Sequence, residues 1–361
     1  MPPARPGLRL ALLAAFALGL LAAGPGRGQV LEPVPPEGTA PPSTPGRRSL
    51  TIDRVVLPAT PAHLEIDEDG GDLIAAFVQL VTGDWMRLVE CGETLCAEPS
   101  SAHATELPAD ALPGSTVAYG DGRINRAWFA DPVSRLGAGA LGGSGAATLA
   151  LEDQAKTMHR LELGLDEAFE DLLPRLADLD GDGEAEVLAV KSTALRGSVL
   201  IAVRLEPAGP RVIAQTEPSG VAQDWLNVVG VADFDGDKRL DLALVRAPDR
   251  GGQLEILNLS EGALRTRQRL RGFSNHRPGS TVVAMSAIAD LDGDKLPDIV
   301  LPDARRTALR VISLAKGRVA EPFRILLPAE AVTEIAVTPT PSGSSLMIIV
   351  GLADGTIAVI R

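Results

Sequence analysis

Histidine, cysteine and aromatic residues are scarce in this sequence: its 361 residues include 4 His and 2 Cys, and 3% are aromatic. Two motifs typical of hydrolases, Gly-x-Ser-x-Gly and His-Glu-x-x-His, do not occur, and no cluster of histidines is suited to a catalytic metal. No run beyond the first 24 residues is apolar for long enough to span a membrane. A catalytic site assembled from distant loops would leave no motif, so these absences count against an enzyme without excluding one.

The two cysteines lie five residues apart in "VECGETLCAE". This spacing predicts a disulfide between Cys91 and Cys96 across a hairpin turn, in a chain that reaches an oxidising compartment. The alternative is a pair of free thiols. A zinc site is not expected, because two cysteines without a nearby histidine provide too few ligands.

The first 24 residues have the pattern of a secretory signal peptide, since Arg5 and Arg9 precede an apolar run from Leu10 to Ala23. We expect cleavage after Gly28, which would leave a secreted or periplasmic chain. A membrane anchor is the alternative, although a spanning helix needs roughly 20 apolar residues. A lipid anchor is not expected, because this segment contains no cysteine.

Basic residues are few relative to acidic ones: 34 Lys and Arg stand against 47 Asp and Glu, a formal net charge of -13. Loss of residues 1–28 would remove three arginines and no acids, which would bring the charge to -16. Such a chain repels nucleic acid and anionic membranes and favours cations. Residues 29–48 contain six prolines and predict an extended linker, so that one folded domain spans 49–361.

Helical periodicity is nearly absent from this domain, whereas short runs of Val, Ile, Leu and Ala recur between Gly, Pro and Asp clusters, which predicts an all-β protein. One acidic pattern repeats, because 55 residues separate Asp178 from Asp233 and a further 57 lead to Asp290. Each repeat has room for four short strands. This is typical of a blade of a β-propeller, and a solenoid is the alternative. In the second repeat the strands are predicted at 227–233, 240–246, 253–259 and 264–270.

Weaker repeats extend the pattern in both directions. "RINRAWFADP" (123–132) aligns with the strand that precedes an acidic loop, and "LIAAFVQL" and "DWMRLVEC" are expected in the first blade. The last blade is one strand short, and "SLTIDRVVLP" (49–58) would supply it, which would close the ring and remove exposed sheet edges. The spacing predicts six blades, or seven if residues 49–120 hold one more.

The three acidic loops are "DLDGDGEAE" (loop 1, 178–186), "DFDGDKRLD" (loop 2, 233–241) and "DLDGDKLPD" (loop 3, 290–298). Their carboxylates at positions 1, 3, 5 and 9, around a glycine, would aim several oxygens at one point, as Ca²⁺ requires. Mg²⁺ is less expected because it prefers a small octahedral shell, and an EF-hand would need flanking helices. The alternative is a set of solvated acidic turns. The predicted ligands of about three ions, with the main-chain oxygen at position 7, are Asp178, Asp180, Asp182, Glu184, Glu186, Asp233, Asp235, Asp237, Arg239, Asp241, Asp290, Asp292, Asp294, Leu296 and Asp298.

The D-x-D-G-D-x-x-x-D loops resemble the FG-GAP or VCBS repeats of the integrin α propeller and of many bacterial secreted proteins. The resemblance is specific over residues 170–330. It implies a seven-bladed β-propeller with Ca²⁺ between the first two strands of certain blades. The chain departs from the family pattern because the Phe-Gly and Gly-Ala-Pro signatures are absent. Gly230 is the one residue that corresponds to part of them. The stretch "IDEDGGD" (66–72) resembles the loop, but its last acid is out of step.

Connections between blades would emerge on the face opposite the acidic loops, at 163–175, 217–227 and 271–280, and loops of this kind commonly carry recognition residues. We expect a candidate ligand face there. The alternative is that the aromatic side chains pack between blades while the polar ones shape a turn. The candidate residues are Trp225, Asn227, Phe273, Asn275, His276 and Arg277.

Two functional classes remain. The sequence favours a monomeric, non-enzymatic interaction module of the cell envelope, stabilised by Ca²⁺, whose partner is an unidentified protein or glycan. The alternative is a hydrolase or lyase on the same scaffold. A cluster of titratable groups at the centre of the face opposite the acidic loops would favour the enzyme, and a neutral centre would favour binding.

Overall fold

The computed structural model describes residues 50–67, 75–92, 94–101, 107–136, 140–142, 145–221 and 224–361. The predicted signal peptide and linker lie outside this part, as does most of the acidic stretch 66–72. The described chain is all-β, as predicted, and its two helical elements are short 3-10 helices, η2 (Pro248–Arg250) and η3 (Ala315–Gly317). No helix in the described ranges is long and apolar enough to cross a membrane.

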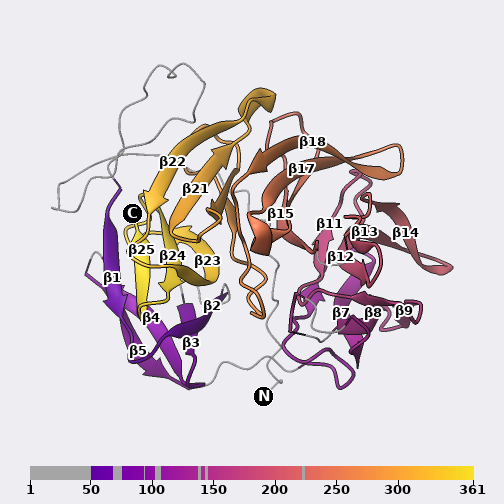
Figure 1. The fold of residues 1–361 in the computed structure, drawn as a ribbon, viewed down its shortest axis with the longest axis horizontal. Coiled ribbons are helices and arrows are strands. Elements are labelled where there is room, and N and C mark those ends of the chain that lie inside the picture. The colour runs from indigo at the N-terminus through magenta and orange to yellow at the C-terminus, as the bar shows by residue number, and fades with distance from the viewer. Residues whose placement is uncertain are drawn as a thin grey trace.

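Four sheets have four antiparallel strands each (Figure 1). In pairing order they are β2 (Pro61–Asp67), β3 (Ala75–Leu80), β4 (Trp85–Cys91) and β5 (Thr94–Ser100); β15 (Leu226–Ala232), β16 (Asp241–Arg246), β17 (Gln253–Ser260) and β18 (Ala263–Arg271); β19 (Ala287–Ala289), β20 (Asp298–Pro302), β21 (Ala308–Ser313) and β22 (Ala320–Leu326); and β23 (Ala331–Pro339), β24 (Leu346–Leu352), β25 (Thr356–Ile360) and β1 (Ile52–Val56).

A fifth sheet of nine strands contains two further sets of four, which the short strand β10 (Glu167–Phe169) joins by pairing with β8 and β12. The described residues therefore form six sets of four strands. The members of the two sets are β6 (Ala118–Tyr119), β7 (Ile124–Val133), β8 (Gly145–Asp153) and β9 (Met158–Glu162), and β11 (Arg175–Ala177), β12 (Glu186–Thr193), β13 (Gly197–Glu206) and β14 (Gly209–Gln215).

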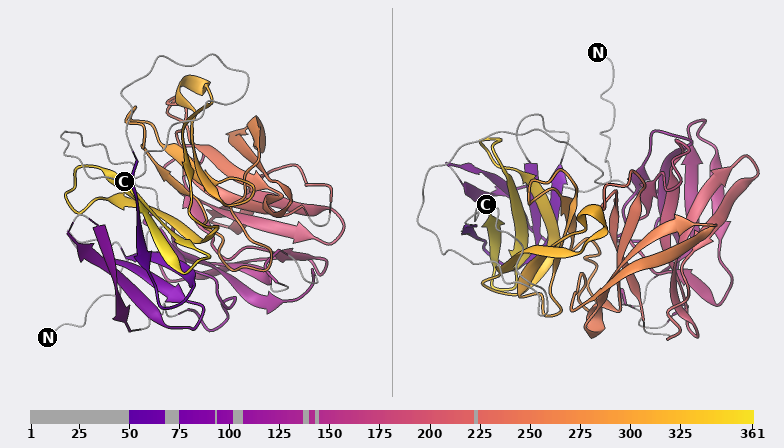
Figure 2. Two further views of the ribbon diagram at one scale, coloured as in Figure 1. Left: turned by 60° about the vertical axis from the view of Figure 1, so that its left-hand side comes forward. Right: turned by 90° about the horizontal axis from the view of Figure 1, so that it is seen from above.

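The six sets follow one another in an arc, with their first strands toward the middle of the molecule (Figure 1). The strand β15 packs against β19, β19 against β23, and β23 against β2, while β6 contacts β11. Figure 2 shows the same sheets from two further sides. The described residues do not show a closed ring, and the seven blades that the resemblance implies are not confirmed.

The second and third strands of most sets are buried on both faces, because neighbouring sheets cover them from either side. In β12 six of the eight residues are buried, and in β13 eight of the ten. Strands in such a position have nearly continuous apolar sequences, which explains the lack of a clear alternation in the repeats.

The first strand of the domain completes the last sheet, as predicted. The strand β1 pairs antiparallel with β25, with Ile52 opposite Ile360, and Arg361 forms an ion pair with Asp53. The strands predicted for the second repeat agree with β15–β18 to within one residue at each end.

One alignment was wrong. The segment 123–132 was aligned with the first strand of a repeat, the strand that precedes the acidic loop elsewhere, but it forms β7, the second strand of its set, and the two-residue strand β6 is the first. Both Trp128 and Phe129 are buried in β7, which pairs with a strand on each side. An apolar run therefore does not distinguish a first strand from a second.

Candidate cation sites

Each acidic loop connects the first strand of a set to the second: loop 1 joins β11 to β12, loop 2 joins β15 to β16, and loop 3 joins β19 to β20. Because the sets share one strand order, the three loops emerge at the same side of their sheets. The glycine at position 4 has φ of 76°, 79° and 85° in Gly181, Gly236 and Gly293. Side chains with a Cβ adopt such values only with strain, so this position requires glycine.

The aspartate at position 1 holds each turn together. In loop 2, the carboxylate of Asp233 accepts hydrogen bonds from the N–H groups of Gly236, Asp237 and Lys238 at 2.8, 3.0 and 2.9 Å. Asp237, at position 5, accepts another from Arg239 N at 2.9 Å. In loops 1 and 3, the carboxylate at position 5 likewise accepts a hydrogen bond from the N–H group of position 7. In these loops the aspartate at position 1 also accepts hydrogen bonds from the N–H groups of positions 4 and 6. The turn itself thus accounts for the acids at positions 1 and 5.

Carboxylate oxygens nevertheless gather in all three loops. In each loop, three side chains offer oxygens that lie within 4.8 Å of one another, a donor set of oxygen alone that is compatible with Ca²⁺. The main-chain oxygens at position 7 remain predictions. The three groups are Asp178, Asp180 and Glu186; Asp233, Asp235 and Asp241; and Asp290, Asp292 and Asp294.

The acid at position 9 is buried in every loop, because it is the first residue of the second strand. Glu186, Asp241 and Asp298 are 0%, 3% and 1% exposed. Burial raises the pKa of Asp241 to about 6 and that of Asp298 to about 7, with neighbouring carboxylates adding to the effect. Burial also raises the pKa of Glu186, against the opposing effect of Arg204. A buried carboxylate of this kind needs a cation or a full set of hydrogen bonds.

The hydrogen bonds of the Asp298 carboxylate are incomplete among the described residues. Its Oδ2 accepts hydrogen bonds from Leu291 N at 2.8 Å and Asp292 N at 3.2 Å. Its Oδ1 is buried and has no hydrogen-bond partner in the described part of the chain. The negative charges of Asp292 and Asp294 act on the carboxylate of Asp298 and add to the rise of its pKa. The residues of loop 3 therefore fit a cation, which would contact the unpartnered oxygen.

Arginines contact the acids of the other two loops. Arg204 forms ion pairs with Asp180 and Glu186 in loop 1 at 2.5 and 2.6 Å. Arg267 lies 3.2 Å from Asp235 and 3.5 Å from Asp241 in loop 2. The sequence pattern of the loops did not indicate either contact.

The residues of the predicted ligand face come together, but mainly in the interior. Five of the six are at most 4% exposed, and Arg277 alone has an exposed side chain. Trp225 donates its Nε1–H to Glu170 O at 2.8 Å. Its ring packs edge-on against the ring of His276, with the two ring centroids 4.7 Å apart. Asn227 donates to Asn275 O at 3.0 Å.

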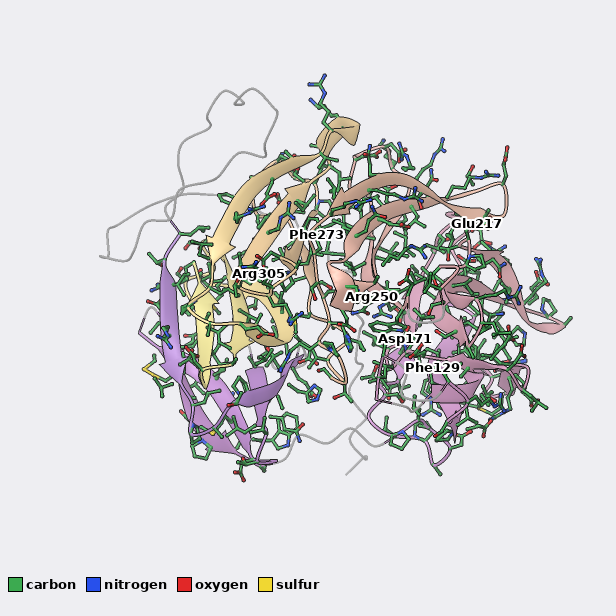
Figure 3. All side chains as sticks on the ribbon, viewed as in Figure 1. Phe129, Asp171, Glu217, Arg250, Phe273 and Arg305 are labelled. Carbon is green, nitrogen blue, oxygen red and sulfur yellow. A yellow bond between two sulfur atoms is a disulfide. The ribbon has the colours of Figure 1, made fainter. Side chains whose placement is uncertain are left out.

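His276 and Phe273 are equally enclosed. His276 contacts Asp249 through Nδ1 at 3.3 Å and Ser280 O through Nε2 at 3.0 Å, while Arg310 lies over the ring of Phe273 at 3.9 Å. Figure 3 places Phe273 at the junction of neighbouring sheets. These contacts correspond to the packing alternative.

Three side chains on the side opposite the acidic loops form a hydrogen-bonded series that no local sequence motif indicates. His63 Nδ1 lies 3.0 Å from Glu334 Oε1, and its Nε2 lies 3.1 Å from Thr281 Oγ1. The pKa of His63 is raised, chiefly because of its hydrogen bond to Glu334. The three residues come from the first strands β2 and β23 and from the connection between β18 and β19, on the side opposite the acidic loops. Only the fold brings them together, so no local motif could have revealed them.

Two exposed leucines were also missed. Leu165 is 88% exposed and Leu195 is 87% exposed, and both lie in connections on the side opposite the acidic loops. The pairing of Glu167 with Thr193 brings these two connections close together. Leu165 lies in the connection predicted at 163–175, so an apolar residue in that connection was the available signal for it.

The predicted disulfide is confirmed, since Cys91 and Cys96 are bonded across the β4–β5 hairpin. A disulfide is compatible with an extracytoplasmic location. No family model matches the chain, and no curated protein matches it in sequence.

Proposed function

We propose that this chain is a Ca²⁺-stabilised β-propeller of the FG-GAP or VCBS type, which works outside the cytoplasm as a non-enzymatic interaction module. The observation that carries the cation-binding part is the buried Asp298 Oδ1, which has no hydrogen-bond partner among the described residues and belongs to a carboxylate on which the charges of other loop 3 acids act. The six four-stranded sets with first strands toward the middle support a six-bladed propeller.

The ion would act as a clamp within a set. Asp290 lies directly after β19, and Asp298 is the first residue of β20. A cation held by both would tie the end of the first strand to the start of the second and would offset the buried charge. Ca²⁺ suits such a site better than Mg²⁺, because it accepts six to eight oxygens in flexible geometry.

The partner would bind on the opposite side. Leu165 and Leu195 expose large apolar side chains there, and exposed apolar groups that lie together are a feature of protein–protein interaction sites. We therefore place a protein partner of the cell envelope at these two connections.

Affinity capture from envelope extract tests this proposal. The wild-type chain is compared with and without a chelator, and with a Leu165→Ser/Leu195→Ser double variant. Val319→Ser is the matched control, because Val319 is also exposed but precedes β22 on the side of the acidic loops. A partner that the wild type and the control retain, and that the double variant loses, supports the proposal. Equal capture by all three chains would contradict the placement of the partner.

A second candidate function is hydrolysis at Thr281, His63 and Glu334. A hydroxyl, an imidazole and a carboxylate in this order are the groups of a nucleophile, its base and the residue that orients the base. In this arrangement Thr281 would donate its proton to His63 Nε2, while Nδ1–H of His63 donates to Glu334. His63 and Glu334 are titratable, and titratable groups on this face favour an enzyme over a pure binding module.

Hydrolysis of p-nitrophenyl esters by the wild-type chain tests this second function. Activity above the uncatalysed rate that falls at least tenfold in Thr281→Ala, and returns in Thr281→Ser, would support it. A wild-type chain without activity, or activity unchanged in Thr281→Ala, would contradict it.

A further inference from the structure

The three acidic loops differ in the residue that faces position 9 from the third strand of the set. The β12–β13 register, with Val187 opposite Val203, places Arg204 opposite Glu186 in loop 1. In loop 2, Asn258 is opposite Asp241. The β20–β21 register, with Ile299 opposite Ile312, places Ser313 opposite Asp298 in loop 3. Directly opposite residues of an antiparallel pair point to the same side of the sheet, so each of these side chains lies beside its position-9 acid.

Arg204 uses this position to fill the centre of loop 1. Its Nε and Nη2 donate to Glu186 Oε1 at 2.8 and 2.6 Å, and Nη2 also donates to Asp180 Oδ2 at 2.5 Å. Its Nη1 lies 3.6 Å from Asp182 Oδ2. One guanidinium thus contacts three of the four acids that the sequence predicts as ligands of a single ion.

The side chain of Arg204 has little freedom to leave. It is 24% exposed, and its backbone is fixed within the paired region of β13. A divalent cation among the same oxygens would lie within a few ångströms of the guanidinium, where like charges repel strongly. Arg267 of loop 2 differs, since it reaches its acids from the fourth strand, is 41% exposed and makes longer contacts of 3.2 and 3.5 Å.

Loop 3 presents the opposite case. Ser313 is a short neutral side chain, and Asp298 Oδ1 beside it is buried without a hydrogen-bond partner in the described part of the chain. A serine in loop 3 therefore takes the position that the arginine has in loop 1, and no described residue forms a hydrogen bond with the buried oxygen.

We infer that the residue opposite position 9 decides which acidic loop takes a divalent cation, and that Arg204 replaces the ion in loop 1. Loop 3 binds Ca²⁺, loop 1 does not, and the chain holds at most two ions where the loop pattern alone predicts three. This inference rests on the proposed binding of Ca²⁺. In loop 1, the ion pairs of Arg204 would take the stabilising part that the ion has in loop 3.

Exchange of the two residues tests the inference. The number of Ca²⁺ ions bound per chain is measured by equilibrium dialysis with ⁴⁵Ca²⁺ for the wild type, Arg204→Ser, Ser313→Arg and the double exchange. Circular dichroism of each variant confirms its fold. We expect Arg204→Ser to bind one ion more than the wild type, Ser313→Arg to bind one fewer, and the double exchange to match the wild type.

The outcomes separate this inference from the function on which it rests. Three ions on the wild type, or unchanged stoichiometry in a folded Arg204→Ser chain, would overturn the inference while leaving Ca²⁺ binding intact. A wild type that binds none would refute the proposed function instead. If Arg204→Ser does not fold, Ser313→Arg decides, because retention of its ion in a folded chain would overturn the inference.

Discussion

Asp298 Oδ2 accepts a hydrogen bond from Leu291 N at 2.8 Å, which ties the first residue of β20 to the start of the loop that precedes it. The other oxygen of this carboxylate, Oδ1, is buried without a hydrogen-bond partner in the described chain, and the charges of Asp292 and Asp294 act on the group. A residue that supports the turn with one oxygen therefore leaves the other for a ligand. The stability of the chain should depend on what contacts that second oxygen.

Asp298→Asn should stabilise the chain when no divalent cation is present. The amide keeps an oxygen for Leu291 N and removes a buried negative charge, so we expect a gain in the free energy of unfolding. Urea unfolding at pH 8 in the presence of a chelator measures it. Asp166→Asn, at an exposed acid outside the loops, is the control and should change little. Loss of stability in Asp298→Asn would contradict the account.

Val55→Ala should destabilise the chain by about 1–3 kcal/mol, because it removes buried methyl groups where β1 completes the last sheet. Val55 is 7% exposed and packs with Ile357 and Val359 of β25. The neighbouring Val56 is 77% exposed, so Val56→Ala should change stability by less than about 0.5 kcal/mol. Chemical denaturation of both variants measures the difference. Equal effects would mean that β1 does not complete this sheet in solution.

Replacement of both Cys91 and Cys96 by serine should cost about 2 kcal/mol, the loop-closure entropy of a short hairpin loop. The measurement is equilibrium unfolding under non-reducing conditions, compared with wild type treated with dithiothreitol. The two should agree. Full stability of the reduced wild type would show that the disulfide contributes nothing to the fold.

Glu170→Gln should change how stability depends on pH. Glu170 is buried, and burial raises its pKa in the folded chain above the usual value of a glutamate. The folded state therefore binds its proton more readily than the unfolded state, so this group adds stability as the pH falls. The difference in unfolding free energy between wild type and Glu170→Gln should shift in favour of the wild type from pH 8 to pH 5. A difference that is constant over this range would contradict the assigned pKa direction.

The sequence was a good guide to the regular parts of the fold. The second repeat has four apolar runs between Gly and Asp clusters, and the strands follow them closely. It was a poor guide where pairing is very short or depends on tertiary contacts. The two-residue β6 has no pattern to detect, and β10 lies in a stretch expected to be a connection.

The candidate sites divide in the same way. The grouping of Asp233, Asp235 and Asp241 follows from local spacing, so it could be predicted. The contact of Arg204 with Glu186 could not be predicted, because it depends on the β12–β13 register across a sequence separation of 18. The place of Trp225 and His276 in the connections between blades suggested that they belong to a ligand face, but this place does not distinguish a binding residue from one that packs between sheets.

Thermal unfolding of the chelator-treated wild-type chain with added Ca²⁺ tests the central claim most directly. A ligand that binds only the folded state stabilises it by about 2.7 kcal/mol at a concentration of 100 Kd. We expect millimolar Ca²⁺ to raise Tm by several degrees, more than the same concentration of Mg²⁺, and the shift to be largely lost in Asp298→Asn. A Tm that Ca²⁺ leaves unchanged would contradict the claim that this protein is stabilised by calcium.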